Sequence, residues 1–243
     1  SNPVKVSRKN FIELCHIVTT EDEKVFKDLF MKIGLSVDWD QEYATIQEVP
    51  REIAQRSFID LYNKGHVYNV QSPSLWDPEF QTAVAQAEIE DREIPGAYHD
   101  IEFETIDGNS FIISTTRPEL LAACVGIAAH PDDKRFIDLI GKTAITPLFE
   151  VEVPIFSSEL VDKDKGTGIL MVCTFGDNVD VQWWKEEGLK TRIIINKYGR
   201  LKDVDFNSDD FKSKQPEKAN EIYKALEGKN LKQAKRIIVD LLS

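Results

Sequence analysis

The sequence has few of the features that mark a secreted, membrane-bound or disulfide-linked protein. No stretch approaches the apolar length that a membrane-spanning helix needs, and the N-terminal SNPVKVSRKN has no apolar core of a signal peptide. The three cysteines, Cys15, Cys124 and Cys173, are odd in number, far apart and form no CxxC pair, which argues against a disulfide framework and a cysteine zinc site. We therefore expect a cytoplasmic location and no membrane partner.

Several enzyme motifs are also absent. The sequence contains no Walker A loop and no GxGxxG, HExxH, GxSxG or H-x-G-H pattern. It has only 4 histidines, so we expect no histidine-rich metal site. His130 precedes Pro131-Asp132-Asp133, where a solvated turn residue is the favoured interpretation.

Positive charge is scarce and unevenly distributed. The formal net charge of −12 argues against a surface built mainly to hold a nucleic-acid backbone, because phosphate binding requires lysine and arginine. Residues 201–243 nevertheless carry 9 basic and 8 acidic side chains, which leaves 21 basic and 34 acidic of the totals of 30 and 42. A nucleic-acid partner would therefore touch this chain at a short end and bind mainly through other surfaces.

Helical periodicity dominates both ends of the chain. Residues 10–33 and 48–65 have the apolar spacing of amphipathic helices, with Thr20 predicted as the N-cap of a second helix in the first region and Gly34 as its end. Residues 216–242 are again predicted to be helical.

The middle of the chain predicts a sheet. From about residue 76, β-favouring runs alternate with turn signals: HDIEFETI, FIISTT, VGIAAH, KTAITPLFEVEVPIF, GILMVCTF and RIIINKYGR. Asp107-Gly108 predicts a hairpin, and short helices are expected at 118–123, 134–140 and 178–187. The expected fold class is α+β with a closed or nearly closed sheet. We expect a mainly helical segment over 1–75, a barrel domain over 76–200 and a helical tail over 201–243.

The segment STTRPEL, residues 114–120, has a structural and a functional interpretation. Structurally, Thr116 would be the N-cap of a helix, Pro118 would lie in its first turn and Glu119 would complete a capping box. Functionally, free backbone N–H groups, the hydroxyls of Thr115 and Thr116 and the Arg117 guanidinium could together hold a phosphate, a carbonyl oxygen or a water.

The segment KGTGILMVCTFGDNVD, residues 165–180, also has two interpretations. Gly166 and Gly168 predict a tight turn, the apolar run predicts a buried strand, and Asp177 predicts the N-cap of a helix. Asp180 adds favourable charge at the positive end of the helix dipole, although Glu or Gln is the usual residue of a capping box. The functional alternative is a pocket that binds a cation.

As a pair, STTRPELL and GTGILMVCTFGDNVD resemble the editing domain inserted into the class I aminoacyl-tRNA synthetases for valine, isoleucine and leucine. The stretches GLSVDWDQEYATI, SPSLWDPEFQTAVAQAEIED and NKYGRLKDV are similar to the segments that flank this insertion. TTRPELLAACVGIAAHPDD is most similar to the valine enzymes, in particular to their archaeal-like form. The resemblance implies a β-barrel-like editing domain with inserted helices, flanked by helical segments. HIGH-type and KMSKS-type signatures are absent, so ATP binding and ligase activity are expected only outside this chain.

The resemblance implies hydrolysis of a mischarged aminoacyl-tRNA, threonyl-tRNA(Val), at its ester bond. Asp180 matches the aspartate that anchors the substrate's α-ammonium, and Asp177 is the candidate acceptor for the threonine hydroxyl. Thr115, Thr116 and Arg117 would orient the ester, the terminal ribose or phosphate, and an attacking water. The implied partners are the acceptor end of tRNA(Val) and the remainder of the synthetase, and neither cofactor nor metal is expected.

The sequence departs from the bacterial-type pattern of the family at three positions. Met171 and Cys173 stand where many members have lysine and threonine, and Gly176 replaces a histidine. Thr174 is the candidate that replaces the missing hydroxyl as a substrate-binding group. Cys173 is not expected to be a nucleophile, because a strand cysteine is usually a small buried apolar residue.

Two alternatives remain open at this point. One is an editing domain of the isoleucine or leucine enzyme, or a free-standing deacylase. The other is a module that binds the acceptor end of tRNA without cleaving it, which the acidic charge would make a weak RNA binder.

Overall fold

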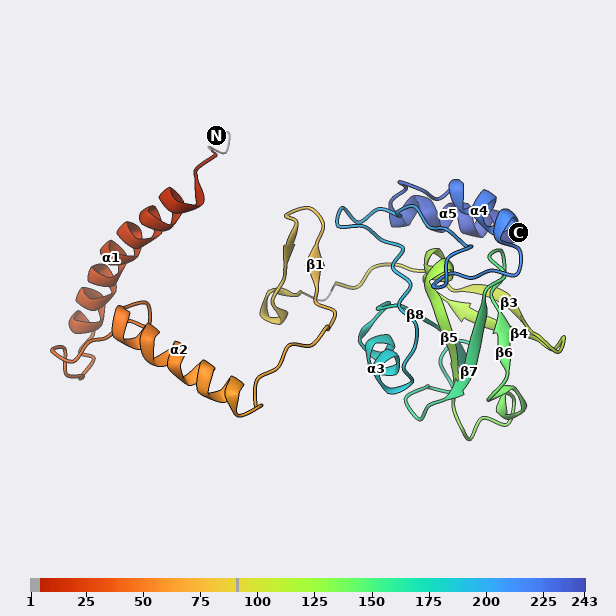
Figure 1. The fold of residues 1–243 in the computed structure, drawn as a ribbon, viewed down its shortest axis with the longest axis horizontal. Helices are drawn as coiled ribbons and strands as arrows, with labels where there is room; N and C mark the ends of the chain where they lie inside the picture. Colours follow the sequence, from red (N-terminus) through yellow and green to blue (C-terminus); the bar gives the residue numbers. More distant parts are fainter. Residues whose placement is uncertain (1–4, 91) are drawn as a thin grey trace. The chain divides into compact units, whose positions relative to one another are not determined.

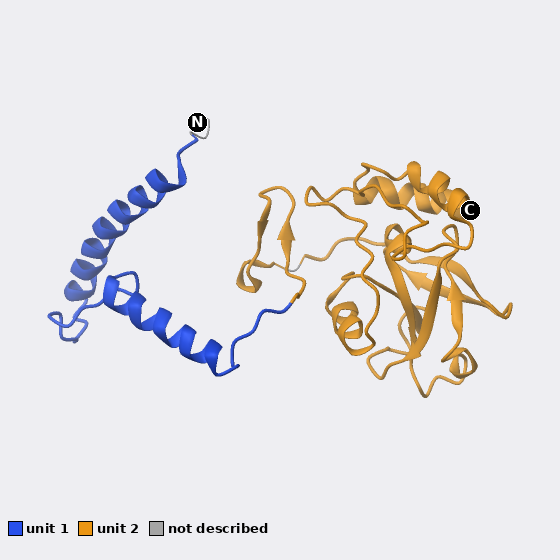
Figure 2. Ribbon diagram, in the orientation of Figure 1, with its two compact units in different colours: residues 1–70 blue, residues 71–243 orange. Residues whose placement is uncertain are grey.

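The computed structural model describes residues 5–90 and 92–243. The first four residues of the expected helical segment, and Asp91 at the end of SPSLWDPEFQTAVAQAEIED, lie outside the described residues. The chain divides into two compact units, residues 1–70 and residues 71–243 (Figure 2). Residues 201–243 thus belong to the same unit as the sheet.

The first unit contains the helices α1 (Arg8–Lys32) and α2 (Glu48–Asn63). The prediction of two helices within 10–33 was wrong, because the structure has one continuous helix there. Thr20 lies inside α1, and its hydroxyl donates to the His16 carbonyl at 2.9 Å instead of capping a new helix. Gly34, at φ +83°, follows the helix as predicted. No residue of α1 or α2 is buried.

The second unit begins with the two-stranded ribbon of β1 (Trp76–Asp77) and β2 (Thr82–Ala83), followed by the short 3₁₀ helix η1 (Gln86–Glu88). The Trp76 indole donates to the Lys197 carbonyl at 2.9 Å, which fixes the ribbon to a later segment of the same unit.

A six-stranded sheet forms the body of the second unit (Figure 1). Its order is β4-β3-β6-β7-β5-β8. The strands are β3 (His99–Thr105), β4 (Ser110–Thr115), β5 (Cys124–Ala129), β6 (Thr143–Ile145), β7 (Glu152–Ser157) and β8 (Ile169–Cys173). All neighbours are antiparallel except the parallel pair β5 and β7.

The two outer strands of the sheet, β4 and β8, come together. The Ser114 backbone N–H of β4 donates to the Thr167 hydroxyl, two residues before β8, at 3.2 Å. The sheet is therefore nearly closed, which confirms the predicted α+β, barrel-like fold. The predicted hairpin between β3 and β4 is also present, with Gly108 at φ +85° in its turn.

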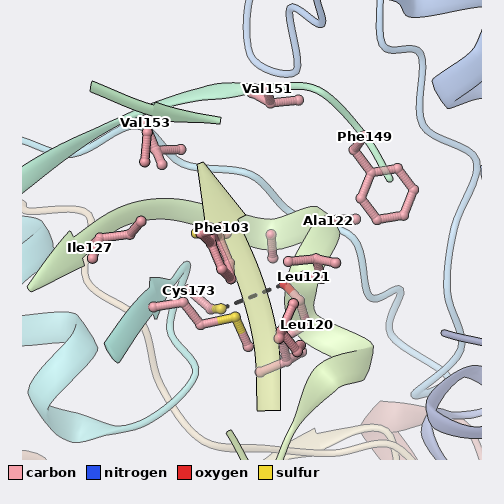
Figure 3. Packing of buried hydrophobic residues seen from close by; sticks show 14 of the residues in the cluster. Phe103, Leu120, Leu121, Ala122, Ile127, Phe149, Val151, Val153 and Cys173 are labelled. Carbon is pink, nitrogen blue, oxygen red and sulfur yellow. Dashed lines mark hydrogen bonds between the residues drawn. The ribbon is translucent and has the colours of Figure 1, made fainter. Parts of the chain in front are cut away.

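The core lies inside this curved sheet. β3 alternates strictly, with Ile101, Phe103 and Thr105 buried and the residues between them exposed. Phe103 and Ile127 belong to the same core cluster as Leu120 and Leu121 of the 3₁₀ helix η2 (Pro118–Ala123), which is entirely buried; these side chains are labelled in Figure 3. The side chains of η2 thus pack into the core directly after β4.

The C-terminal region consists of two helices, α4 (Pro216–Lys224) and α5 (Leu231–Leu242), in place of the single predicted helical stretch. Their buried residues join the sheet's core cluster, among them Tyr223, Ala234 and Ile238. Asn230 caps α5 in a capping box with Gln233.

The strand predicted over RIIINKYGR did not form. In the described chain only an isolated bridge joins Ile195 to Leu201, and Arg192 bonds to other segments. The Arg192 N–H donates to the Thr174 hydroxyl at 2.8 Å, and its buried guanidinium donates to the carbonyls of Cys124 and Asp210. The helix expected at 134–140 is the shorter 3₁₀ helix η3 (Ile137–Leu139), whereas α3 (Asn178–Glu186) matches its prediction closely.

Candidate functional site

A cavity of about 500 Å³ lies where β4, η2, β8 and the start of α3 meet. It is lined by five of the six candidate residues: Thr115, Thr116, Arg117, Asp177 and Asp180. These residues come from segments about 60 positions apart, and the approach of β4 to β8 brings them together. Thr174 does not line the cavity, since its hydroxyl accepts the Arg192 N–H.

Asp180 is the most unusual group in the cavity wall. It is only 7% exposed, and its Oδ2 atom accepts the Cys173 backbone N–H at 3.2 Å. The pKa of Asp180 is raised from 3.8 to about 7, first by burial and then by the neighbouring Asp177 charge, against the lowering effect of backbone donors and Arg117. A buried carboxyl group with a perturbed pKa in a cavity marks a candidate functional site.

Gly176 is required by the position of Asp180. A Cβ atom at residue 176 would overlap the Asp180 Oδ2 atom and lie 3.5 Å from the Cys173 side chain. The backbone of Gly176 has no positive φ, so the need for glycine here is one of space. This contact gives a physical reason for the glycine at a position where the resemblance suggested a histidine.

Phe175 sets the direction of the chain into this turn. It has φ +55°, in the left-handed region that costs non-glycine residues about 1–2 kcal/mol. Its ring packs edge-on against Trp184 of α3, with ring centroids 5.1 Å apart. This packing holds a strained residue next to the cavity, a feature that the sequence pattern did not indicate.

Asp177 caps α3 as predicted. Its Oδ1 atom accepts the N–H groups of Val179 and Asp180, both at 2.9 Å. Within residues 5–90 and 92–243, no hydrogen bond uses its Oδ2 atom. Capping therefore occupies one carboxylate oxygen and leaves the other free to accept a hydroxyl from a bound molecule.

The capping role gives a direct prediction for stability. Asp177→Ala is expected to lower the free energy of unfolding by about 0.5–2 kcal/mol, measured by urea denaturation. Asp177→Asn should lose less, because an amide oxygen can accept the same two hydrogen bonds. Equal losses in the two variants would show that the cap hydrogen bonds do not contribute.

Arg117 joins the two walls of the cavity. Its Nη1 atom donates to the Gly176 carbonyl at 2.7 Å, and its Nε atom lies 3.4 Å from Glu119 Oε1. The Thr115 hydroxyl accepts the Arg117 N–H at 3.1 Å. The guanidinium thus fixes the Gly176 turn, while the Arg117 side chain remains 43% exposed.

Thr116 is exposed at the cavity rim and does not cap η2, contrary to its structural interpretation. The residue at the cap position is Arg117, with Pro118 at the start of the helix as predicted. The Thr116 carbonyl accepts the Lys235 ammonium of α5 at 2.8 Å.

Two residues that contact the cavity lining, without lining it themselves, were given no such role from the sequence. Glu119 was interpreted as a capping-box partner, but it is buried, and its Oε2 atom has no hydrogen-bond partner within the described chain. Thr167 joins β8 to β4 through Ser114 and also donates to the Ile169 carbonyl at 3.1 Å. The position of Thr167 between two glycines was the available signal.

The two cysteines near the cavity are unsuited to nucleophilic attack. Cys173 is 3% exposed, and burial raises the pKa of its thiol well above 9. Its Sγ atom lies 3.5 Å from the Leu120 carbonyl (Figure 3). Burial likewise raises the pKa of Cys124 to about 12.

A second hollow, of about 770 Å³, is a weaker candidate. Its two basic residues already have partners, since Arg135 pairs with Asp133 at 2.6 Å and Lys142 with Asp107 at 2.7 Å. Among the described residues, no group of three or more His, Cys, Asp or Glu is placed to hold a metal ion, and no helix is long and apolar enough to cross a membrane.

Comparison with known protein families gives a decisive result. The family model described as "tRNA synthetases class I (I, L, M and V)" matches residues 1–234. The chain belongs to this family. The class I tRNA synthetase assignment covers residues of both compact units, including all of α4 and the first turn of α5.

Within the class I tRNA synthetases, this chain is similar to valine–tRNA ligases. It is 49% identical over 241 residues to the enzyme of Thermobifida fusca, covering 99% of this chain and 27% of that protein. It is 51% identical over 199 residues to the enzyme of Salinispora arenicola, covering 82% of this chain and 23% of that protein. The chain therefore spans about a quarter of the length of these relatives.

Two solved structures of the family show weaker similarity. One, described as the ternary complex of Agrobacterium radiobacter K84 agnB2 LeuRS-tRNA-LeuAMS, is 20% identical with a TM-score of 0.36, over 72% of this chain and 32% of that chain. The other, described as GlLeuRS-CP1, is 16% identical with a TM-score of 0.31, over 37% of this chain and 59% of that chain.

Proposed function

We propose that the 500 Å³ cavity is an editing site that hydrolyses the ester of threonyl-tRNA(Val). The observation that carries this proposal is the buried Asp180 carboxyl group at the cavity wall. The substrate of such a reaction has a free α-ammonium group beside its ester. A fixed carboxylate in a partly desolvated cavity is the group best suited to bind that ammonium.

In this proposal Asp177 supplies selectivity for threonine. Threonine differs from valine by a hydroxyl in place of a methyl group, and a hydrophobic pocket made for valine discriminates poorly against it. The Asp177 Oδ2 atom would accept the threonine hydroxyl, while a valine side chain would leave that oxygen without a partner at a cost of about 1–3 kcal/mol. Asp177 would thus cap α3 and bind substrate with different oxygens.

The proposed chemistry is direct attack by water. The water oxygen bonds to the ester carbonyl carbon, the bond to the ribose oxygen breaks, and the leaving ribose oxygen takes up a proton. Thr115, Thr116 and Arg117 would orient the ester, the terminal ribose or phosphate, and the water, with the neighbouring ribose hydroxyl assisting. The substrate-binding role expected for Thr174 would be indirect, through its hydrogen bond to Arg192.

The proposed reaction uses no cofactor and no metal ion. ATP would be needed only for amino-acid activation, at a site outside this chain, which spans about a quarter of its relatives. We place the reaction in the cytoplasm, in protein biosynthesis, with tRNA(Val) and the remainder of a valine–tRNA ligase as partners.

The test is hydrolysis of separately prepared aminoacyl-tRNAs. Threonyl-tRNA(Val) is expected to be hydrolysed at least about tenfold faster than valyl-tRNA(Val), as expected for one hydrogen bond to a charged acceptor. Faster hydrolysis of valyl-tRNA(Ile) would instead indicate the specificity of the isoleucine enzymes. Binding of tRNA(Val) without hydrolysis of either ester would make the chain an acceptor-end binding module.

A further inference from the structure

Helix α5 places basic side chains beside the rim of the cavity. Lys232, Lys235 and Arg236 lie within two turns of this helix, in a chain whose net charge is −12. Lys232 and Arg236 are exposed, whereas Lys235 is half-buried. Neither exposed residue forms a hydrogen bond or an ion pair with any part of the chain that the structure describes.

Lys235 fixes how α5 is turned relative to the cavity. Its ammonium donates to the carbonyl of Thr116, which lines the cavity, at 2.8 Å. The buried residues Ala234 and Ile238 lie next to Lys235 around the helix and anchor α5 in the core. Lys235 therefore marks the edge of α5 that faces the rim.

The helical geometry then places the other two basic residues. Each residue of an α-helix advances by about 100° around the axis, so Lys232, Lys235 and Arg236 share an arc of about 100°. Lys235 is the member of this arc nearest to the buried Ile238, and Lys232 and Arg236 continue outward from it. The basic arc thus begins at the cavity rim and extends into solvent. Only Asp240, one turn beyond Arg236, brings negative charge to this side of α5.

The exposed residues of the basic arc differ from those of the other lysine-rich surface of this unit in having no hydrogen-bond or ion-pair partner within the described chain. A groove of about 640 Å³ contains Lys190, Lys212 and Lys214. Two of these are engaged, since Lys190 donates to the Asp209 carbonyl at 2.8 Å and Lys214 pairs with Glu152 at 3.0 Å. Lys232 and Arg236 have no such partners, so their charges remain available to a ligand.

We propose that Lys232 and Arg236 bind backbone phosphates of a single-stranded RNA 3′ end whose terminal nucleoside occupies the cavity. The cavity lining has three aspartates against one arginine and one lysine, so its net charge does not attract a polyanion. A strand that enters over Thr116 passes the basic arc first, and there its phosphates meet positive charge. This inference rests on the proposed function, because it takes the cavity to be the place where the RNA ends.

Lys232 and Arg236 would give a chain of net charge −12 a local site for RNA phosphates. Two phosphate contacts would supply only part of the affinity for a strand, and most of it would come from other parts of a longer protein. For single-stranded RNA each contact contributes about 0.7 to the slope of log K against log salt. Loss of both residues should therefore reduce that slope by about 1.4 and weaken binding roughly 10- to 30-fold at 0.1 M salt.

The test compares Lys232→Ala/Arg236→Ala with Lys212→Ala/Lys218→Ala, a control that removes two exposed lysines from the same unit. Binding of uncharged tRNA(Val) is measured over a salt series, and deacylation is measured on threonyl-tRNA(Val) and on 3′-threonyl-adenosine. We expect weaker binding, a smaller salt slope and a higher KM for the tRNA in the first variant. The rate on threonyl-adenosine should not change.

Several results would overturn the proposal. One is an equal loss of tRNA binding in the control variant, and another is an unchanged salt slope in the Lys232/Arg236 variant. A parallel loss on threonyl-adenosine would also count against it, since that substrate has no backbone phosphate. Binding of uncharged tRNA requires no hydrolysis. If the cavity proved inactive, the proposed function would be contradicted, but binding of tRNA by Lys232 and Arg236 could still be measured.

Discussion

Asp180→Ala is expected to lower kcat/KM for hydrolysis of threonyl-tRNA(Val) by roughly 100-fold or more, in a protein that still folds. Removal of one partner from a buried charge pair costs about 2–5 kcal/mol, and here the other partner would be the substrate's ammonium. Deacylation is measured under single-turnover conditions, and folding by circular dichroism. Asp162→Ala is the matched control, because Asp162 is an exposed carboxylate that lines the same cavity.

The pKa of about 7 at Asp180 also sets a pH dependence. Only the ionised carboxylate binds an ammonium, so kcat/KM should fall about tenfold for each pH unit below 7 and level off above it. A folded Asp180→Ala protein with wild-type deacylation would contradict the role of Asp180.

The same group makes stability depend on pH in a defined direction. The pKa of Asp180 is higher in the folded protein than the ordinary value of 3.8, so the folded state binds more protons between pH 3.8 and about 7. The free energy of unfolding should therefore fall as pH rises through this window, by up to roughly 4 kcal/mol. Asp180→Asn should remove this decrease and make the protein more stable than wild type at pH 8.

Gly176→Ala is expected to produce nearly as large a loss of activity. The added methyl group would overlap the Asp180 Oδ2 atom, so the carboxylate must leave its hydrogen bond to the Cys173 N–H. We expect kcat/KM to fall about 30-fold or more and the free energy of unfolding to fall by about 1–3 kcal/mol, the usual cost of overpacking. Single-turnover deacylation and urea denaturation measure the two effects.

Gly96→Ala is the matched control for this substitution. Gly96 has no positive φ, and a Cβ atom there meets nothing within 4 Å, so the change should be nearly neutral. The double variant Gly176→Ala/Asp180→Ala should be no less active than Asp180→Ala alone, because both changes act on one carboxylate. Fully additive losses would show that Gly176 acts through something other than Asp180.

The parts of the fold that local sequence patterns specify were predictable. Asp107-Gly108 indicated the hairpin of β3 and β4, and the β-favouring run HDIEFETI indicated the strand β3. Asp177 indicated the start of α3, since a carboxylate before an amphipathic run is a common N-cap. The roles assigned to the candidate site residues remain predictions.

The features that depend on contacts between distant segments were not predictable. Thr20 had the sequence signature of a cap, but its hydroxyl is satisfied within a continuous helix. The run predicted as a strand from Arg192 forms only an isolated bridge, and its Arg192 side chain binds two carbonyls from other segments, which no local pattern indicated. Glycine is needed at 176 because the Asp180 Oδ2 atom lies where a Cβ atom would be. The pKa of Asp180 is raised mainly because the folded chain buries its carboxyl group.

The near-closure of the sheet has a kinetic consequence for the cavity. The bond between Ser114 and Thr167 spans 53 residues, and β5 pairs with β7 in parallel across a long connection. Long-range pairings of this kind form slowly, after local hairpins such as that of β3 and β4. The two cavity walls meet only when β4 reaches β8, so Asp180 remains in water until the sheet closes. Proton uptake by this carboxyl near neutral pH would thus report one of the last steps of folding.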